Sequence, residues 1–252
     1  MQKLILVTPI YKETLDQEEF TSVQVSLCKL PNYKHIFICP DSLKIEYYQE
    51  KFKNSEYIYF PKDYFFSQWT YNQLCYEVEF YKIFAAYEFM LIMQTDAIIL
   101  QPEKLKYWLE SNYDYVGAPE SHVYSYDLTG IPPFNKFKKS MNPIRLRGLN
   151  GGLSLRRINK FIEIIEENND ITTYFRSHSG GIGEDIFFSL MSRISMKDFK
   201  VPNEIMAADF SLTVDFSEWL DFKNNEMPFG LHAWFRKKQD KDLVMNILGE
   251  KT

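Results

Sequence analysis

An acidic residue follows a continuous apolar run in the middle of this sequence. The run is Phe89–Met93, and Gln94, Thr95 and Asp96 come directly after it. A short run without polar residues is typical of a strand covered on both faces, as in a parallel sheet between helices. Polar residues at the end of such a strand lie where open α/β sheets bind their ligands. Asp96 is therefore a candidate ligand for a hard divalent cation, and a turn-forming Asp is the alternative.

A pair of acids, Glu184 and Asp185, opens the predicted helix EDIFFSLMSRI. Carboxylates in a first turn are favoured by the helix dipole, so this placement has a purely structural explanation. That explanation does not cover the preceding SGGIG stretch, which indicates a loop that needs conformational freedom or close contact. Chemical and structural roles both stay open for these two acids.

Two more stretches contain residues suited to a ligand site. Gly151 and Gly152 follow Asn150, and such a pair permits either a tight turn or close approach of a ligand to the backbone. His232 follows a Pro-Phe-Gly sequence and is either a hydrogen-bonded structural residue or an imidazole ligand. Imidazole would favour Mn²⁺ over Mg²⁺.

The ends of two earlier strands carry the remaining candidates. These are Thr8, Pro9, Tyr11 and Asp41. A nucleotide base and its ribose would sit at such edges of an open sheet. Tyr11 could stack on the base and Asp41 could accept a hydrogen bond from base or ribose, whereas ordinary loop structure is the alternative for both.

Alternating strands and helices must position these residues. Strands are expected at Lys3–Tyr11, His35–Ser42, Glu56–Pro61, Phe89–Met93, Tyr113–Pro119 and Leu153–Arg157. Helices are expected at Lys12–Gln24, over Thr70–Phe89 with Leu74, Val78, Tyr81 and Ala85 on the buried face, from Pro102 onwards, and at Glu184–Ile194. This alternation predicts an α/β fold with a parallel sheet. The interval from Glu120 to Arg147 shows no sustained period, and we expect a long loop that closes over a ligand.

Composition limits the class of protein and the partner. The 252 residues, 45% of them hydrophobic, suffice for one compact globular unit. A net charge of −5 argues against nucleic acid. Basic residues cluster at 135–139 and at Arg145, Arg147, Arg156 and Arg157, where the alternatives are a solvated loop and strand end or contact with an anionic substrate or membrane surface.

Targeting signals and cysteines bear on location. The three cysteines show no metal-binding spacing and are typical of a reducing compartment. The first apolar run is too short for a signal sequence, and no run approaches the roughly 20 residues that span a bilayer. We expect a cytoplasmic protein, with peripheral contact at the inner face of a membrane left open.

Several motifs together resemble one enzyme class. VTPIYKE, QTDA, YDYVGAP, NGGLSLR, EDIFF and PFGLHAW occur in this order and span nearly the whole chain. The pattern resembles glycosyltransferases of the GT-A type, and within them a family of bacterial GT-A-like domains catalogued as having unknown function. The resemblance implies a GT-A-like α/β single domain over residues 1–252, with a mostly parallel central sheet flanked by helices. Residues 1–100 would form the nucleotide-binding half and residues 101–252 the acceptor and catalytic half.

The resemblance also implies roles for individual residues. Asp96 and His232 would hold Mn²⁺ or Mg²⁺ on the donor diphosphate, whose growing charge such an ion stabilises. The Asn-Gly-Gly stretch would line the sugar pocket. Asp185 would be the base, and Glu184 would bind acceptor or sugar hydroxyls. Gln94 departs from the usual Asp-x-Asp motif, so either Asp96 alone supplies the ionic ligand or metal dependence is weak.

The function implied is sugar transfer from a nucleotide sugar, with a UDP-sugar as first choice, to a hydroxyl of a glycan or glycolipid. Inversion is the expected outcome, and synthesis of bacterial surface glycans or glycoconjugates is the expected context. Two alternatives stay open: a sugar nucleotidyltransferase, and a nucleotide-sugar-binding protein without turnover, which Gln94 favours.

Overall fold

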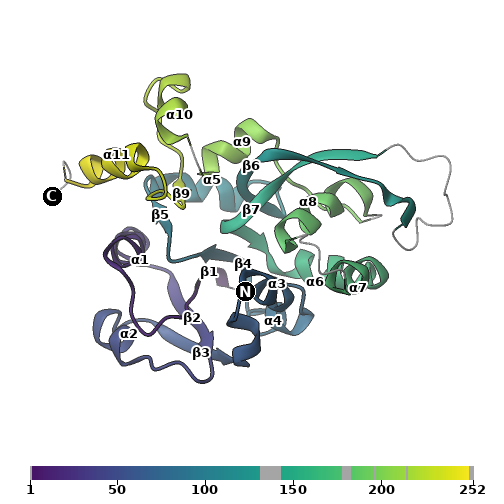
Figure 1. The fold of residues 1–252 in the computed structure, drawn as a ribbon, viewed down its shortest axis with the longest axis horizontal. Coiled ribbons are helices and arrows are strands. Elements are labelled where there is room, and N and C mark those ends of the chain that lie inside the picture. Colours follow the sequence, from purple (N-terminus) through teal and green to yellow (C-terminus); the bar gives the residue numbers. More distant parts are fainter. Residues whose placement is uncertain (1, 131–142, 178–182, 196, 214, 250–252) are drawn as a thin grey trace.

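A six-stranded sheet forms the centre of the molecule (Figure 1). The computed structural model describes residues 2–130, 143–177, 183–195, 197–213 and 215–249. The sheet has the order β3-β2-β1-β4-β7-β6. Its strands are β1 (Gln2–Pro9), β2 (Lys34–Pro40), β3 (Glu56–Phe60), β4 (Tyr87–Met93), β6 (Tyr115–Tyr126) and β7 (Ile144–Arg157). β1 to β4 are parallel and β7 is antiparallel to both its neighbours, so the expected mostly parallel sheet is confirmed.

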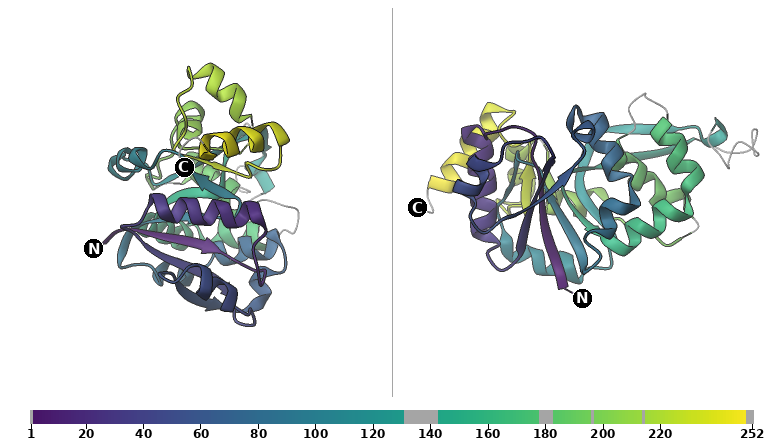
Figure 2. Two further views of the ribbon diagram at one scale, coloured as in Figure 1. Left: turned by 90° about the vertical axis from the view of Figure 1, so that its left-hand side faces the viewer. Right: turned by 90° about the horizontal axis from the view of Figure 1, so that it is seen from below.

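Helices cover both faces of this sheet (Figure 2). One face packs against α3 (Gln68–Cys75), α4 (Val78–Lys82), α6 (Ile158–Glu167), α7 (Asn169–Ser177) and α8 (Glu184–Ile194). The other packs against α1 (Gln17–Lys29), α2 (Glu46–Lys51), α5 (Leu105–Glu110) and α9 (Glu204–Phe210). Successive residues of β1 show why both faces need cover: Ile5 and Val7 enter the first core, whereas Leu4 and Leu6 enter the second.

A second, three-stranded sheet lies beyond the end of β4. Its order is β5-β9-β8, with β5 (Ala97–Ile99), β8 (Ser211–Leu212) and β9 (Gly230–His232). The remaining elements are the 3₁₀ turns η1 (Lys62–Phe65), η2 (Pro102–Lys104) and η3 (Leu128–Gly130) and the helices α10 (Phe216–Phe222) and α11 (Lys238–Gly249). Within the described residues, no helix combines the length and the apolar character needed to cross a membrane.

The first expected helix is displaced along the chain. It was expected over Lys12–Gln24, but α1 begins at Gln17 because Asp16 and Glu19 form a capping box. The Glu19 amide donates to Oδ1 of Asp16 at 2.9 Å, and the Asp16 amide donates to Oε2 of Glu19 at 3.2 Å. Lys12 therefore lies in the loop before the helix.

The expected helix over Thr70–Phe89 is two short helices. α3 ends at Cys75 and α4 begins at Val78, because Glu77 between them has an extended backbone. After the break, Phe80 and Phe84 are buried in the core and Val78 is half-buried against it. Ala85, which was expected on the buried face, is exposed. Leu74 and Tyr81 are buried as expected.

The segment from Glu120 to Arg147 is not a loop at either end. β6 runs on to Tyr126 and pairs with β7 from Ile144, so the two strands project from the body as a hairpin (Figure 1). Pro119 pairs with Leu149 and Val123 with Arg147, which places three residues of β6 opposite one of β7. This irregularity hides the strand alternation in the sequence. Residues 131–142 lie outside the described part of the chain.

Phe161 of α6 is expected to be a main contributor to stability. Its ring is fully buried, with ring centroids 4.1 Å from Phe188 of α8 and 5.2 Å from Tyr81 of α4. Phe161→Ala should lower the free energy of unfolding in urea by about 3 to 5 kcal/mol. Phe222→Ala, at a side chain that is 65% exposed, is the matched control and should change it by less than about 0.5 kcal/mol. Equal losses in the two variants would contradict this account of the core.

Candidate functional site

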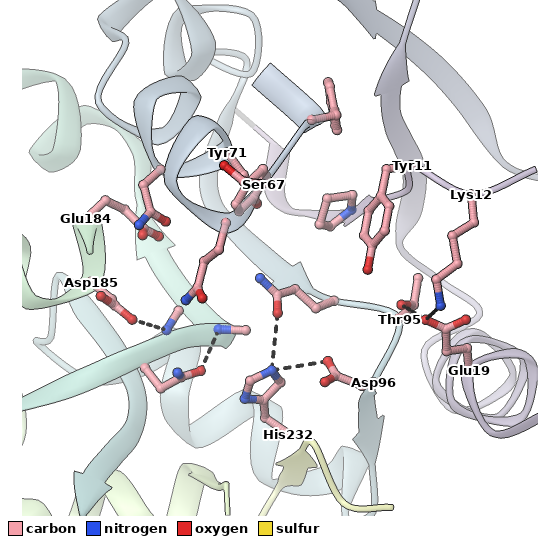
Figure 3. Close-up of a pocket in the computed structure, with 18 of the residues that line it drawn as sticks. Tyr11, Lys12, Glu19, Ser67, Tyr71, Thr95, Asp96, Glu184, Asp185 and His232 are labelled. Atoms are coloured by element: carbon pink, nitrogen blue, oxygen red, sulfur yellow. Dashed lines mark hydrogen bonds and ion pairs between the residues drawn. The ribbon is translucent and has the colours of Figure 1, made fainter. Parts of the chain in front are cut away.

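A cleft of about 640 Å³ opens where β1 and β4 end (Figure 3). The predicted site residues that line it are Pro9, Tyr11, Gln94, Thr95, Asp96, Asn150, Gly151, Gly152, Glu184, Asp185 and His232. Thr8 and Asp41 are outside this lining. The Thr8 hydroxyl is buried 3.0 Å from Nε2 of His35, and Asp41 is exposed after β2. The chain thus brings its separate motifs together at one place, with those two exceptions.

Three side chains converge at one end of the cleft floor. Nε2 of His232 lies 3.1 Å from Oδ1 of Asp96 and 3.2 Å from Oε1 of Gln94. Strand pairing fixes this arrangement, because Ala97 of β5 pairs with His232 of β9. The Ala233 amide then donates to the Asp96 carbonyl at 2.8 Å, and Ala233 has a φ of 56°. The chain therefore makes a sharp left-handed turn directly after His232.

These three groups fit a divalent cation in chemistry and spacing. A carboxylate oxygen, an amide oxygen and an imidazole nitrogen are ligands that Mg²⁺ or Mn²⁺ accepts. Ligands at right angles, each about 2.1 Å from such an ion, lie about 3 Å apart, close to the two distances observed. Among the described residues, no group of three or more His, Cys, Asp and Glu side chains could hold a metal ion. Any ion here would therefore depend on Gln94 as a neutral ligand.

Asp96 also has a cationic neighbour at the mouth of the cleft. Nη2 of Arg236, a largely exposed side chain, lies 3.3 Å from Oδ2 of Asp96. Burial alone would raise the pKa of Asp96, but hydrogen bonding to His232 and the charge of Arg236 hold it below its usual value. Asp96 is therefore an anion available to a cationic partner.

The two glycines of β7 make room for protein side chains. A Cβ at Gly152 would overlap the imidazole ring of His232. A Cβ at Gly151 would lie 2.8 Å from Nη2 of Arg156 and 2.9 Å from Oε1 of Glu184. The Asn150 side chain is also engaged: Oδ1 accepts from the Gly152 amide at 2.9 Å, and Nδ2 donates to Glu120 at 3.0 Å. The stretch is thus strand and not the tight turn that its sequence also permits.

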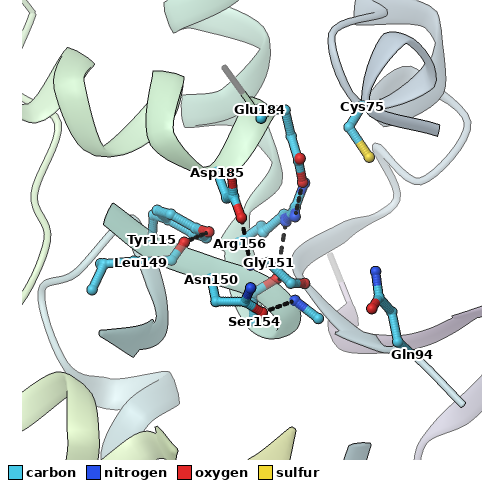
Figure 4. A network of polar contacts seen from close by, with 12 residues as sticks. Cys75, Gln94, Tyr115, Leu149, Asn150, Gly151, Ser154, Arg156, Glu184 and Asp185 are labelled. Carbon is cyan, nitrogen blue, oxygen red and sulfur yellow. Dashed lines mark hydrogen bonds and ion pairs between the residues drawn. The ribbon is translucent and has the colours of Figure 1, made fainter. Parts of the chain in front are cut away.

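Glu184 forms a buried ion pair under the other end of the cleft floor (Figure 4). Nη2 of Arg156 donates to Oε1 of Glu184 at 2.7 Å, and both side chains are almost inaccessible to water. With its amide nitrogen turned to the acid, Asn72 donates to Oε2 at 2.9 Å. Both carboxylate oxygens of Glu184 are therefore held by the protein.

Asp185 is held more loosely and faces the cleft. Its Oδ1 accepts from the Ile186 amide at 2.8 Å, and its Oδ2 accepts from the Gly151 amide at 3.4 Å. Burial, the charge of Glu184 and then that of Glu120 raise the pKa of Asp185 to about 7. A carboxyl with such a pKa exchanges a proton readily near neutral pH.

Other lining residues were not identified from the sequence. They are Lys12, Asp16, Glu19, Phe65, Phe66, Ser67, Gln68, Tyr71, Asn72, Phe235 and Arg236. The Asp-x-x-Glu spacing of the α1 capping box was a detectable signal for Asp16 and Glu19. Glu19 accepts from Lys12 at 2.8 Å and from the Thr95 hydroxyl at 2.9 Å, which links α1 to the end of β4. Tyr11 and Phe66 are large aromatic side chains that are 58% and 69% exposed in the lining.

Comparisons with known proteins agree with this architecture. The family model described as "Protein of unknown function (DUF5672)" matches residues 54–232. No curated protein matches the chain. The solved structure of the galactosyltransferase LgtC with donor and acceptor sugar analogues aligns with a TM-score of 0.57 at 13% identity, over 98% of this chain and 95% of that one. An active-site mutant of LgtC aligns with a TM-score of 0.53 at 14% identity, over 96% and 95%. The expected GT-A-like α/β fold is confirmed.

Gly152→Ala tests whether the position of the His232 side chain requires a glycine at residue 152. The added methyl group must displace the imidazole or the strand, and such overpacking should lower the free energy of unfolding by about 1 to 3 kcal/mol. Gly249→Ala is the matched control, because a Cβ there meets no atom within 4 Å. Urea unfolding of both variants decides the matter, and equal stability of Gly152→Ala and the parent would show that the close contact is not required.

The raised pKa of Asp185 predicts a pH dependence of stability. A carboxyl whose pKa is higher in the folded than in the unfolded state stabilises the fold at low pH, and this contribution is lost as pH rises through the folded value. Between about pH 4 and pH 7 the parent should therefore lose stability relative to Asp185→Asn. Thermal unfolding at pH 4.5 and pH 8 measures this difference. A constant gap between the two proteins would contradict the raised pKa.

Proposed function

This chain belongs to the family described as "Protein of unknown function (DUF5672)", and we propose that it is a glycosyltransferase acting on a nucleotide-sugar donor and a hydroxyl acceptor. One observation carries the proposal. The floor of a single cleft brings together three groups that could bind a cation, on Asp96, Gln94 and His232, and a carboxyl of raised pKa, on Asp185. Figure 3 shows Asp96 and His232 to one side of Asp185. A metal-assisted, inverting transfer of a sugar from a diphosphate uses both kinds of group.

The first group suits the leaving diphosphate. When bound, a divalent cation stabilises the negative charge that grows on the diphosphate as its bond to the sugar breaks. Asp96 and His232 would hold that cation, and Gln94 would complete the protein ligands. Arg236 lies beside Asp96 at the cleft mouth and would add a positive charge toward the phosphates.

The second group suits the acceptor. As the acceptor oxygen bonds to the anomeric carbon and the bond from that carbon to the diphosphate oxygen breaks, the proton of the acceptor hydroxyl must leave. Asp185 would take it as a general base. Attack from the side opposite the diphosphate inverts the anomeric carbon, so we propose an inverting transfer. Glu184 would line the sugar site as a fixed carboxylate, since both its oxygens are engaged.

The aromatic lining suits the nucleotide. Tyr11 is largely exposed at the end of β1, where it would stack on the base. We propose a UDP-sugar as the donor and a glycan or glycolipid as the acceptor, in the synthesis of a bacterial surface glycan at the cytoplasmic side of the membrane. These finer choices rest on the sequence resemblance. Gln94 favours a second candidate, a nucleotide-sugar-binding protein without turnover, because a neutral amide adds no charge to the cation site.

Two substitutions should separate the roles in the cleft. The purified protein is incubated with a panel of nucleotide sugars, a panel of glycan and glycolipid acceptors, and Mn²⁺, Mg²⁺ or EDTA, and the released nucleoside diphosphate is measured. Asp96→Asn should lower release by about a hundredfold or more and weaken donor binding. Asp185→Asn should lower kcat by about a hundredfold or more with donor affinity nearly unchanged. Asp170→Asn, at an exposed acid in the first turn of α7, is the matched control and should behave as the parent.

Each result of this assay has a distinct meaning. Donor binding without release would support the binding protein. Full activity in EDTA would contradict the proposed role of a divalent cation. Full activity of Asp185→Asn would contradict the proposed role of Asp185 as the general base. Neither binding nor release with any donor would contradict the proposed function.

A further inference from the structure

Arg156 is a fully buried charge beneath the cleft floor. Its Nη1 donates to the Tyr81 hydroxyl at 3.0 Å, its Nε to the Ser154 hydroxyl at 3.1 Å and its Nη2 to Glu184 at 2.7 Å. Tyr81 in turn donates to the carbonyl of Cys75 at 3.0 Å. The guanidinium is thus fixed by neighbours from β7, α4 and α8, and its one anionic contact is with Glu184 within the described residues.

Stability alone is a weak reason for such a pair. Removing two charges from water costs about as much as their attraction returns, so a buried ion pair contributes little net stability. The position of the pair is more informative, because Glu184 precedes Asp185 directly in the chain. Residue 151 is a glycine, and a side chain there would collide with the contact between Arg156 and Glu184. Glu184 and Asp185 both line the cleft, but burial is almost complete for the Arg156–Glu184 pair, whereas Asp185 is only partly buried.

We propose that Arg156 is a positioning residue, which holds Glu184 as a fixed carboxylate on the cleft floor and leaves Asp185 as the carboxyl that exchanges a proton with the acceptor. This inference rests on the proposed function for the identity of the proton donor. The two adjacent acids would thus have different roles: Glu184 stays ionised in its ion pair, and Asp185 takes up and releases a proton. Without Arg156, Glu184 would be a second unpaired acid beside Asp185, and the two would compete for one proton.

The charges around Asp185 make the inference testable. On its own helix Asp185 faces Glu184, with Arg156 of β7 behind it, and Glu120 faces it from β6. Uncharged phenols also surround it: Tyr76 after α3, and Tyr115, Tyr124 and Tyr126 of β6. Changes at Arg156 and Glu184 should therefore move the titration of Asp185 in opposite directions.

The experiment follows the titration of Asp185 by NMR of ¹³C-labelled aspartate, with Asp185→Asn to assign the signal. Arg156→Met should raise the midpoint by about one pH unit or more, and Glu184→Gln should lower it by about one. Arg156→Lys keeps the charge and should stay near the parent. In the double variant Arg156→Met with Glu184→Gln, the midpoint should fall between those of the parent and Glu184→Gln. The double variant leaves no unpaired charge at this position, so the Asp185 midpoint can still be measured in it if Arg156→Met alone does not fold.

Arg157→Met is the matched control. Arg157 is the next residue of β7, but it pairs with Asp114 at 3.0 Å and with Glu88 at 2.5 Å, away from the cleft lining. Its loss should leave the Asp185 midpoint unchanged. Identical midpoints in the parent, Glu184→Gln and the double variant would overturn the inference and reduce the pair to a structural contact.

The titration needs no substrate, so it is decided separately from the proposed function. If Arg156→Met and Glu184→Gln shift the Asp185 midpoint in opposite directions but the protein transfers no sugar, the coupling of Asp185 to these charges is supported and the proposed function is contradicted. In an active protein, the midpoint of the pH profile of kcat should move with the NMR midpoint, while donor affinity stays constant. An unmoved kcat profile beside a moved titration would contradict Asp185 as the group that takes the proton.

Discussion

The close packing of protein side chains against Gly151 and Gly152 is the constraint on which the cleft depends. β7 is irregular at this point, since Gly117 and Ala118 of β6 pair with Ser154 and Asn150. Cβ atoms added at the two glycines would meet different neighbours, so the pair makes room for two sets of side chains. His232 packs against Gly152, and the Arg156–Glu184 pair packs against Gly151. A side chain at either position would displace one end of the cleft floor. The same short stretch of backbone therefore sets the positions of the cation ligands and of the proton-accepting carboxyl.

Strand pairing fixes the end of β4 and His232 relative to Gly151 and Gly152. β4 pairs with β7 up to Met93 and Leu153, and the Gln94 amide donates to the Gly152 carbonyl at 2.8 Å. The end of β4 is thus tied to the glycine pair before the chain reaches Asp96. In the three-stranded sheet, Ala97 of β5 pairs with His232 of β9, which places His232 beside Asp96. The geometry of the site follows from hydrogen bonds between strands far apart in the sequence.

Much of this arrangement was predictable from the sequence, and the remainder has identifiable causes. The continuous apolar runs located β1, β2 and β4 to within two residues at each end, and the acidic start of α8 was assigned to its first residue. The first helix was predicted, but its start was placed at Lys12 and not at Gln17, where a capping box begins it. The break at Glu77 was not predicted, because the extended backbone there interrupts an otherwise helical spacing. For Arg156 the sequence left open a solvated strand end or contact with an anionic substrate or membrane surface, whereas the side chain is fully buried. Its burial depends on Glu184 and Tyr81, which approach it only in the folded chain.

The most direct test of this account is a crystal structure with Mn²⁺ and a non-hydrolysable nucleotide sugar, in which anomalous scattering locates the ion. We expect the ion between Asp96, Gln94 and His232, bound to the diphosphate. We also expect the anomeric carbon to present the face opposite the diphosphate toward Asp185. An ion elsewhere, or a sugar whose open face points away from Asp185, would contradict the assignment of the two ends of the cleft.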